Sequence, residues 1–146
     1  MTSSSLAQFY VVDCSVVTDV LLATERGQSA RGYFSSTIQL CAPSLLNAEV
    51  LSVLRRMSLR KEIDEWTATQ AVYDLRNLGI DLFDMTDYLD TVWTWKHNAS
   101  MYDAMYLTLA QITDTKLLTF DRRLAKAAPH LTLEPNYASD DAPYFK

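Results

Sequence analysis

The sequence predicts an α/β domain, built on a central and mainly parallel sheet of four or five strands that is flanked by helices. Two observations predict it. Short apolar runs alternate along the chain with longer stretches of helical periodicity, and parallel strands need such crossovers between them. The chain has 146 residues, of which 49% are hydrophobic and 21% are charged, and this is the size and composition of one globular domain. We therefore expect residues 1–146 to form a single domain.

The expected strands are short apolar runs. They are residues 9–13, 39–42, 80–84, 116–120 and 131–133. In an open parallel sheet, ligands bind in the crevice beyond the carboxyl ends of the strands. The residues that follow these runs are therefore the first candidates for a functional site.

The expected helices lie between the strands and are supported by caps or by periodicity. Residues 16–23 form the first, with Ser15 available as its N-cap. The helix after the second strand has apolar residues at a 3.6-residue period, namely Leu46, Val50, Val53, Leu54 and Met57. Gly79 ends a helix, and Ser100 caps another. Residues 26–36 fit no single pattern, and a short helix is one interpretation. The remaining expected helices are residues 63–78, 88–95, 101–112 and 122–128.

Composition excludes several classes of protein. Three glycines in 146 residues are too few for a phosphate-binding or dinucleotide-binding glycine loop, which excludes both. The two cysteines, Cys14 and Cys41, have neither a disulfide pattern nor zinc-ligand spacing. The formal net charge is −5, whereas proteins that hold nucleic acid by bulk electrostatics are usually basic. A nucleic-acid function would therefore need a local basic patch or a bound cation.

The sequence also bears on location. No apolar run approaches the ~18 residues that a membrane span requires. The first five residues show no basic segment followed by a long apolar segment, which a secretory signal would have. We therefore expect a cytoplasmic protein that does not enter a membrane.

Four carboxylates fall at the ends of expected strands or near the starts of expected helices. They are Asp13, Glu49, Asp103 and Asp121. Each has a structural explanation, since Asp13 and Asp121 can be N-caps and Asp103 can complete a capping box with Ser100. Glu49 lies at the border of an apolar helix stripe, where a carboxylate is half-buried and needs a partner such as an arginine, or a cation.

Together the four carboxylates indicate more than capping. Carboxylates gathered in one crevice repel one another and raise each other's pKa. Such a cluster is stable at neutral pH chiefly when a divalent cation occupies it. Oxygen ligands favour Mg²⁺ or Mn²⁺, and carboxylates that hold Mg²⁺ against substrate phosphates are a recurrent arrangement. A bound cation would also explain how an acidic protein attracts a polyanion.

Four motifs carry a resemblance to a known family. They are VVDCSV at residues 11–16, APSLLNAEV at 42–50, HNASMYDAMY at 97–106 and LLTFDRRL at 117–124. In order and separation they resemble the motifs of PIN-domain ribonucleases, specifically of VapC-type toxins from bacterial type II toxin–antitoxin systems. The resemblance covers about residues 9–128 and implies the PIN-like three-layer α/β fold. Residues 134–146 form an acidic and aromatic tail beyond the motifs.

The resemblance implies an activity and partners. The activity is that of a Mg²⁺-dependent endoribonuclease, with Mn²⁺ as a substitute, which hydrolyses RNA phosphodiester bonds through a metal-activated water and leaves a 5′-phosphate. The partners are the RNA substrate, a cognate antitoxin that neutralises the enzyme and blocks its crevice, and a second copy of the chain in a homodimer.

The resemblance also implies roles for individual residues. Asp13 would be the central metal ligand and Asp103 the second, while Glu49 and Asp121 would bind the metal directly, bind it through water, or orient the attacking water. Residues that match positions supporting the carboxylates are Ser15, Asn98 and Thr119.

Basic and aromatic residues near the motifs have two interpretations each. Arg122 and Arg123 start beside the expected crevice and are candidates to contact RNA phosphates, although a solvated face is the structural alternative. Trp93 and Trp95 could stack on unpaired bases, but core packing is the favoured interpretation. His97 has no nucleophile or acid at a recognisable spacing and is interpreted as structural.

Two alternative functions remain open at the level of the sequence. The first is a phosphatase or phosphotransferase that uses Asp13. A haloacid-dehalogenase-like phosphatase needs a second aspartate two residues later, where this chain has Ser15, and Cys14 breaks the acidic pair of a receiver-type domain, in which Asp84 would be the acid that ends the third strand. The second is a non-catalytic α/β interaction module whose acids are only helix caps.

Overall fold

The computed structural model describes residues 8–136. Its centre is a five-stranded sheet with the strand order β3-β2-β1-β4-β5, and every neighbouring pair is parallel. The strands are β1 (Gln8–Val12), β2 (Ile38–Pro43), β3 (Asp81–Phe83), β4 (Leu117–Leu118) and β5 (Thr132–Leu133). The predicted mainly parallel sheet is therefore confirmed. Since β1 is the central strand, its carboxyl end lies in the middle of the sheet's edge.

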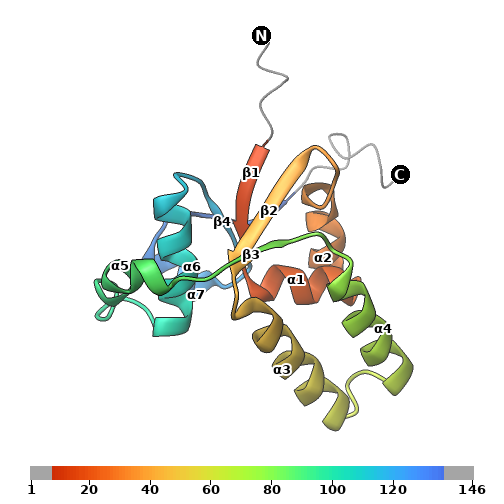
Figure 1. Ribbon diagram of the computed structural model, residues 1–146. Helices are drawn as coiled ribbons and strands as arrows, with labels where there is room; N and C mark the ends of the chain where they lie inside the picture. Colours follow the sequence, from red (N-terminus) through yellow and green to blue (C-terminus); the bar gives the residue numbers. More distant parts are fainter. Residues whose placement is uncertain (1–7, 137–146) are drawn as a thin grey trace.

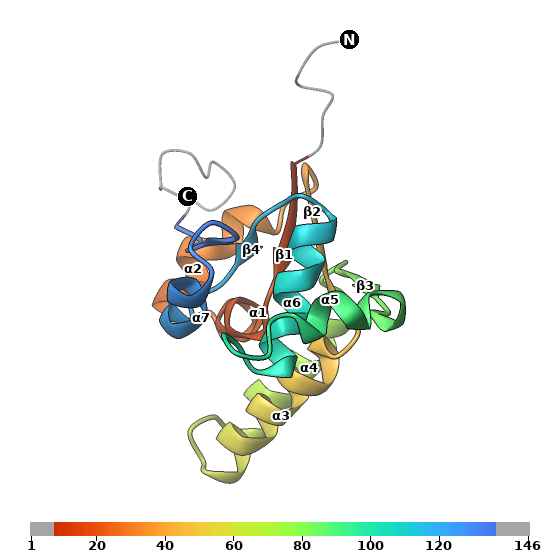
Figure 2. The same cartoon turned by 90° about the vertical axis from the view of Figure 1, so that its left-hand side faces the viewer.

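Helices cover both faces of the sheet, as predicted. Figure 1 shows α1 to α4 on one side of the sheet and α5 and α6 on the other, with α3 and α4 projecting beyond the strand ends. The longer helices are α1 (Cys14–Leu21), α3 (Leu46–Leu59), α4 (Glu65–Arg76) and α6 (Met101–Ile112), and the shorter ones are α2 (Glu25–Ala30), α5 (Leu89–Trp93) and α7 (Arg122–Ala127). In the view turned by 90°, α6 lies across β1 and β2 (Figure 2).

Two helix boundaries differ from the sequence prediction for identifiable reasons. The first helix begins at Cys14, and its N-cap is Asp13, whose side chain accepts from the backbone N–H groups of Ser15 and Val16. Residues 26–36 fall across α2 and a 3₁₀ turn (Arg31–Tyr33). In α2 the N-cap Thr24 accepts from the backbone N–H of Gly27, which is a local signal that the lack of apolar periodicity obscured.

The core lies between the sheet and α1, α3 and α6. Val11, Val12, Val16, Val17 and Leu46 are fully buried in it. The expectation that both tryptophans pack in the core is wrong for Trp93, whose side chain is 59% exposed. Trp95 does pack against the core, and its indole Nε1 donates to the side chain of Gln111 at 2.9 Å.

Membrane insertion through a helix has no support in the described residues. None of the helices within residues 8–136 combines the length and the apolar character that crossing a bilayer requires. The longest, α3, has 14 residues and ends in a cluster of arginines.

Candidate active site

Asp13 is placed at the carboxyl end of the central strand by the sequence itself. The apolar run of β1 ends at Val12, and Asp13 then caps α1 in an extended conformation. Its Oδ1 accepts from the backbone N–H groups of Ser15, at 3.0 Å, and Val16, at 3.3 Å. The side chain is only 6% exposed, so this carboxylate is buried where three neighbouring strands end.

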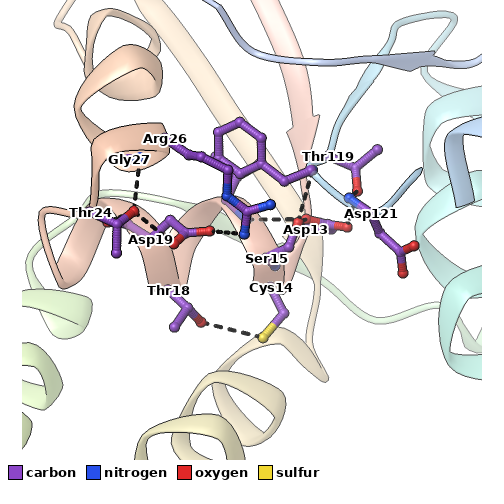
Figure 3. A network of polar contacts seen from close by, with 12 residues as sticks. Asp13, Cys14, Ser15, Thr18, Asp19, Thr24, Arg26, Gly27, Thr119 and Asp121 are labelled. Atoms are coloured by element: carbon purple, nitrogen blue, oxygen red, sulfur yellow. Dashed lines mark hydrogen bonds and ion pairs between the residues drawn. The ribbon is translucent and has the colours of Figure 1, made fainter. Parts of the chain in front are cut away.

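Ser15 and Thr119 hold the Asp13 carboxylate from two elements, as the motif resemblance implied for both. Ser15 Oγ donates to Oδ1 at 2.6 Å, and Thr119 Oγ1 donates to Oδ2 at 2.5 Å. Each hydroxyl also accepts from a backbone N–H after β4, since Phe120 N donates to Ser15 Oγ and Asp121 N donates to Thr119 Oγ1, both at 3.0 Å. Figure 3 shows how these contacts join the ends of β1 and β4.

Burial dominates the electrostatics of Asp13. It raises the pKa of this carboxyl from 3.8 to about 6, although hydrogen bonds from Ser15 and Thr119 and the two backbone donors act in the opposite direction. Because burial disfavours the charged form of a carboxyl group, an ionised and unpartnered Asp13 would destabilise the folded state. The site therefore favours either a proton or a cation at Asp13.

Asp103 and Asp121 lie close together with Arg123 between them. Asp103 is in the first turn of α6, and Asp121 is the N-cap of α7. Arg123 Nη2 lies 3.9 Å from Asp103 Oδ2 and 3.6 Å from Asp121 Oδ2. Burial, followed by the charge of Asp121, raises the pKa of Asp103, whereas Ser100 and Arg123 lower it. The guanidinium thus provides a cation between two carboxylates that would otherwise repel each other.

Glu49, on α3, completes the set of four acids. It is half-buried, as its position at the border of the apolar stripe predicted. Its partner among the described residues is not an arginine but Tyr106, whose hydroxyl donates to Oε1 at 2.6 Å. Burial raises the pKa of Glu49, the Tyr106 hydrogen bond lowers it, and the charge of Asp103 raises it.

Tyr106 is the residue that sequence analysis missed. Its ring is 2% exposed, and burial together with Glu49 raises the pKa of its hydroxyl far above the usual range. It therefore remains a hydrogen-bond donor at every physiological pH. Tyr106 lies one turn after Asp103 on α6, and a buried tyrosine hydroxyl usually has a hydrogen-bond partner. Only packing, however, brings it to Glu49, 57 residues away in sequence.

The donor atoms of these residues determine whether they fit a divalent cation. Within residues 8–136, no three acidic, histidine or cysteine side chains are gathered closely enough to hold a metal ion. The donor chemistry nevertheless fits, because all the predicted ligands are carboxylates, which Mg²⁺ and Mn²⁺ prefer. The Oδ2 atom of Asp13 accepts only the Thr119 bond among the described residues, which leaves a lone pair on this oxygen for a cation.

Two further predicted residues, within the part of the chain that the structure describes, form no hydrogen bond or ion pair with the four carboxylates. Asn98 is exposed in the segment between α5 and α6 and, within the described part of the chain, forms no side-chain hydrogen bond to any of the four acids; it lines a hollow beside Asp103 instead. Arg122 is exposed at the start of α7. Of the two arginines, Arg123 is therefore the one that reaches the acidic residues.

Comparison with known proteins identifies the class to which this fold and site belong. The family model of the PIN domain matches residues 10–129. The chain belongs to the PIN domain family. Its relatives include Ribonuclease VapC1 of Mycobacterium tuberculosis, which is 41% identical over 128 residues that cover 85% of this chain and 93% of that protein. Ribonuclease VapC3 of the same organism is 32% identical over 82% of this chain and 87% of its own length.

Solved structures agree with the fold. PAE2754 from Pyrobaculum aerophilum superposes with a TM-score of 0.62 at 19% identity, over 84% of this chain and 87% of that one. The VapC20 toxin of Mycobacterium tuberculosis, described as cleaving the sarcin-ricin loop, also gives a TM-score of 0.62, at 16% identity over 81% of this chain and 94% of that one. The PIN-like three-layer fold predicted from the motifs is confirmed.

Proposed function

We propose that this protein is an endoribonuclease toxin of the VapC type that depends on Mg²⁺ or Mn²⁺. The observation that carries the proposal is the buried Asp13 carboxylate, whose pKa is raised to about 6. It follows the central strand of a PIN fold. Among the other three acids, the charge of Asp121 acts on Asp103 and the charge of Asp103 acts on Glu49. Relatives that are named ribonucleases and share 41% and 32% identity support this activity.

Asp13 and Asp103 are the residues that would hold the cation, with Glu49 and Asp121 beside them. When bound, a divalent cation lowers the pKa of a water and screens charge that develops on the phosphate. Ser15 and Thr119 donate three hydrogen bonds to the Asp13 carboxylate and the backbone N–H of Val16 donates a fourth, so the carboxylate is kept in one orientation. A carboxylate fixed in this way loses little conformational entropy when it binds a charged ligand.

Glu49 and Arg123 would act on the reacting groups. Tyr106 donates to Oε1 of Glu49, so Oε2 is the oxygen that would accept a hydrogen bond from the attacking water. Arg123 has a side chain that is 84% exposed and would donate to a phosphate oxygen of the substrate. Hydrolysis in line then leaves a 5′-phosphate and a 3′-hydroxyl.

The proposed partners follow from the same site. The RNA substrate is joined by a cognate antitoxin, which would cover the crevice and place a basic side chain against the acids. A homodimer in the cytoplasm is the expected form of the toxin. The alternative interaction module has one observation in its favour, because Asp13 and Asp121 do cap α1 and α7, but capping does not require the burial of Asp13.

Cleavage of total RNA by the purified protein tests the proposal. We expect cleavage with Mg²⁺, loss of cleavage with EDTA, and recovery when Mn²⁺ is added, because the four acids repel RNA without a cation. The products should be substrates for a 5′-phosphate-dependent exonuclease. An Asp13→Asn preparation made in parallel controls for contaminating nucleases. Cleavage that persists in EDTA, or that is equal in the variant, would contradict the proposal.

A further inference from the structure

A hollow lies beside the acidic residues, on the side of Asp103. Its volume is about 290 Å³, and it is formed by the segment between α5 and α6 and by the first turns of α7. Six of the residues that line it are polar or charged: Lys96, His97, Asn98, Ser100, Asp103 and Arg123. Asp103 and Arg123 therefore belong both to the hollow and to the proposed active site.

The charge of this hollow is opposite to that of the acidic residues next to it. Two permanent cations, Lys96 and Arg123, face one carboxylate, Asp103. His97 provides an N–H donor in either protonation state, and Asn98 provides an amide donor. In a chain of net charge −5, this is the kind of local basic patch that a nucleic-acid function requires.

Lys96 is held at this position from outside the hollow. Its Nζ lies 5.4 Å from the centre of the exposed Trp93 ring, an attractive cation–π distance. This contact gives the exposed Trp93 a role that core packing does not, because it limits the directions in which the ammonium points. Lys96 and His97 are both exposed, so a ligand can reach them without any change in the fold.

We propose that the hollow binds a backbone phosphate of the RNA strand next to the phosphate that is cleaved. Lys96, His97 and Asn98 donate to its oxygens, and Arg123 stands between this phosphate and the acids. The inference rests on the proposed ribonuclease function and adds a substrate-binding subsite to it. It also gives Asn98 and His97 a role in binding the substrate, where the sequence indicated support of a carboxylate and a structural histidine.

Binding of a short fluorescein-labelled single-stranded RNA, followed by fluorescence anisotropy, tests the subsite. The protein carries Asp13→Asn so that the RNA stays intact, and is compared with Lys96→Ala, His97→Ala and the double change. Lys126→Ala is the matched control, because it removes an exposed cation from α7 that does not line the hollow. We expect the double change to weaken RNA binding roughly tenfold. The slope of the logarithm of the binding constant against the logarithm of the salt concentration should become shallower by about 0.7 for each lost phosphate contact. The Kd of Lys126→Ala should stay within about twofold of the parent value.

A second readout separates the subsite from general charge. In the catalytically intact protein, Lys96→Ala should raise KM for RNA cleavage and leave kcat nearly unchanged, as expected when binding is lost equally in the ground and transition states. In a series of RNAs, a single neutral methylphosphonate linkage is placed at each position in turn. At one position this linkage should weaken binding to the parent protein but not to the double variant.

The outcomes distinguish the subsite from the proposed function. Equal losses in Lys126→Ala, or no linkage whose effect disappears in the double variant, would overturn the subsite, and RNA cleavage by the wild type would still support the ribonuclease. Lys96-dependent RNA binding by a protein that cleaves no RNA would keep the hollow as a site for an RNA phosphate and overturn the nuclease.

Discussion

Asp13→Asn should reduce RNA cleavage by roughly a thousandfold or more, because it removes the charge on which the proposed cation site depends. The asparagine keeps the shape of the side chain and can still accept from Ser15 and Val16, so the cap of α1 should survive. Asp84→Asn is the matched control. Asp84 also follows a strand, but it is exposed and bonds only to Thr86 among the described residues, and its variant should cleave RNA at the wild-type rate. Equal activity in Asp13→Asn would show that Asp13 is only a cap.

The same substitution should stabilise the metal-free protein above pH 6. The pKa of Asp13 is raised on folding from 3.8 to about 6, so the folded state binds a proton that the unfolded state has lost. The stabilisation that this bound proton gives the folded state is complete below about pH 4 and disappears as the pH rises through 6. We expect the free energy of unfolding of the variant to be about 1–3 kcal/mol higher than that of the wild type near neutral pH in EDTA. It should also decline less steeply as the pH rises from about 4 to 6. Chemical denaturation at several pH values measures both, and an unchanged decline would contradict the assignment of the buried charge to Asp13.

Gly27→Ala should destabilise the protein by about 3 kcal/mol or more, or roughly 6–12 °C in Tm for a chain of this size. A Cβ at this position would lie 2.0 Å from the backbone oxygen of Asp19. Since backbone atoms of α1 cannot rotate away, α2 would have to move. The movement would disturb Thr24, which bonds to Asp19 at 2.7 Å, and Arg26, which is paired with Asp19 at 2.6 Å and lies over the Phe120 ring next to Asp121. These contacts are visible in Figure 3.

Gly79→Ala is the comparison that isolates the steric cause. Gly79 has a φ of +73°, but a Cβ added there would have no atom within 4 Å, so alanine meets only the conformational cost of about 1 kcal/mol. Thermal unfolding of both variants should therefore separate them clearly. A Gly27→Ala protein as stable as the wild type would show that α1 and α2 do not pack with their backbones in contact.

The positions of the acids were predictable because each depends on local signals. The apolar run of β1 stops at Asp13, Ser100 accepts from the backbone N–H of Asp103, and the apolar stripe of α3 places Glu49 at its border. These signals lie within a few residues of each acid in the sequence, and the structure places each of these acids on the expected element.

The partners of the acids were not predictable in the same way. The motif resemblance implied that Ser15 supports a carboxylate, but no local signal shows that its hydroxyl also accepts from the backbone N–H of Phe120, 105 residues after Ser15. Tyr106 reaches Glu49 only through the packing of α6 against α3. Arg123 and Asn98 owe their places to the side-by-side arrangement of α7 and the segment before α6. Contacts of this kind depend on the tertiary structure, and no spacing in one sequence reports them.

Thermal unfolding during a titration with Mg²⁺ and with Mn²⁺ tests the central claim most directly, because it asks whether the four acids hold a cation without requiring the RNA target. A ligand at a hundred times its Kd stabilises the folded state by about 2.7 kcal/mol, so the wild type and Asp84→Asn should each gain roughly 5–10 °C in Tm. Asp103→Asn should lose most of this metal-dependent gain, whatever its own starting Tm. If neither metal shifts the wild type, or if Asp103→Asn responds as the wild type does, the acids serve as helix caps and the metal-dependent nuclease is contradicted.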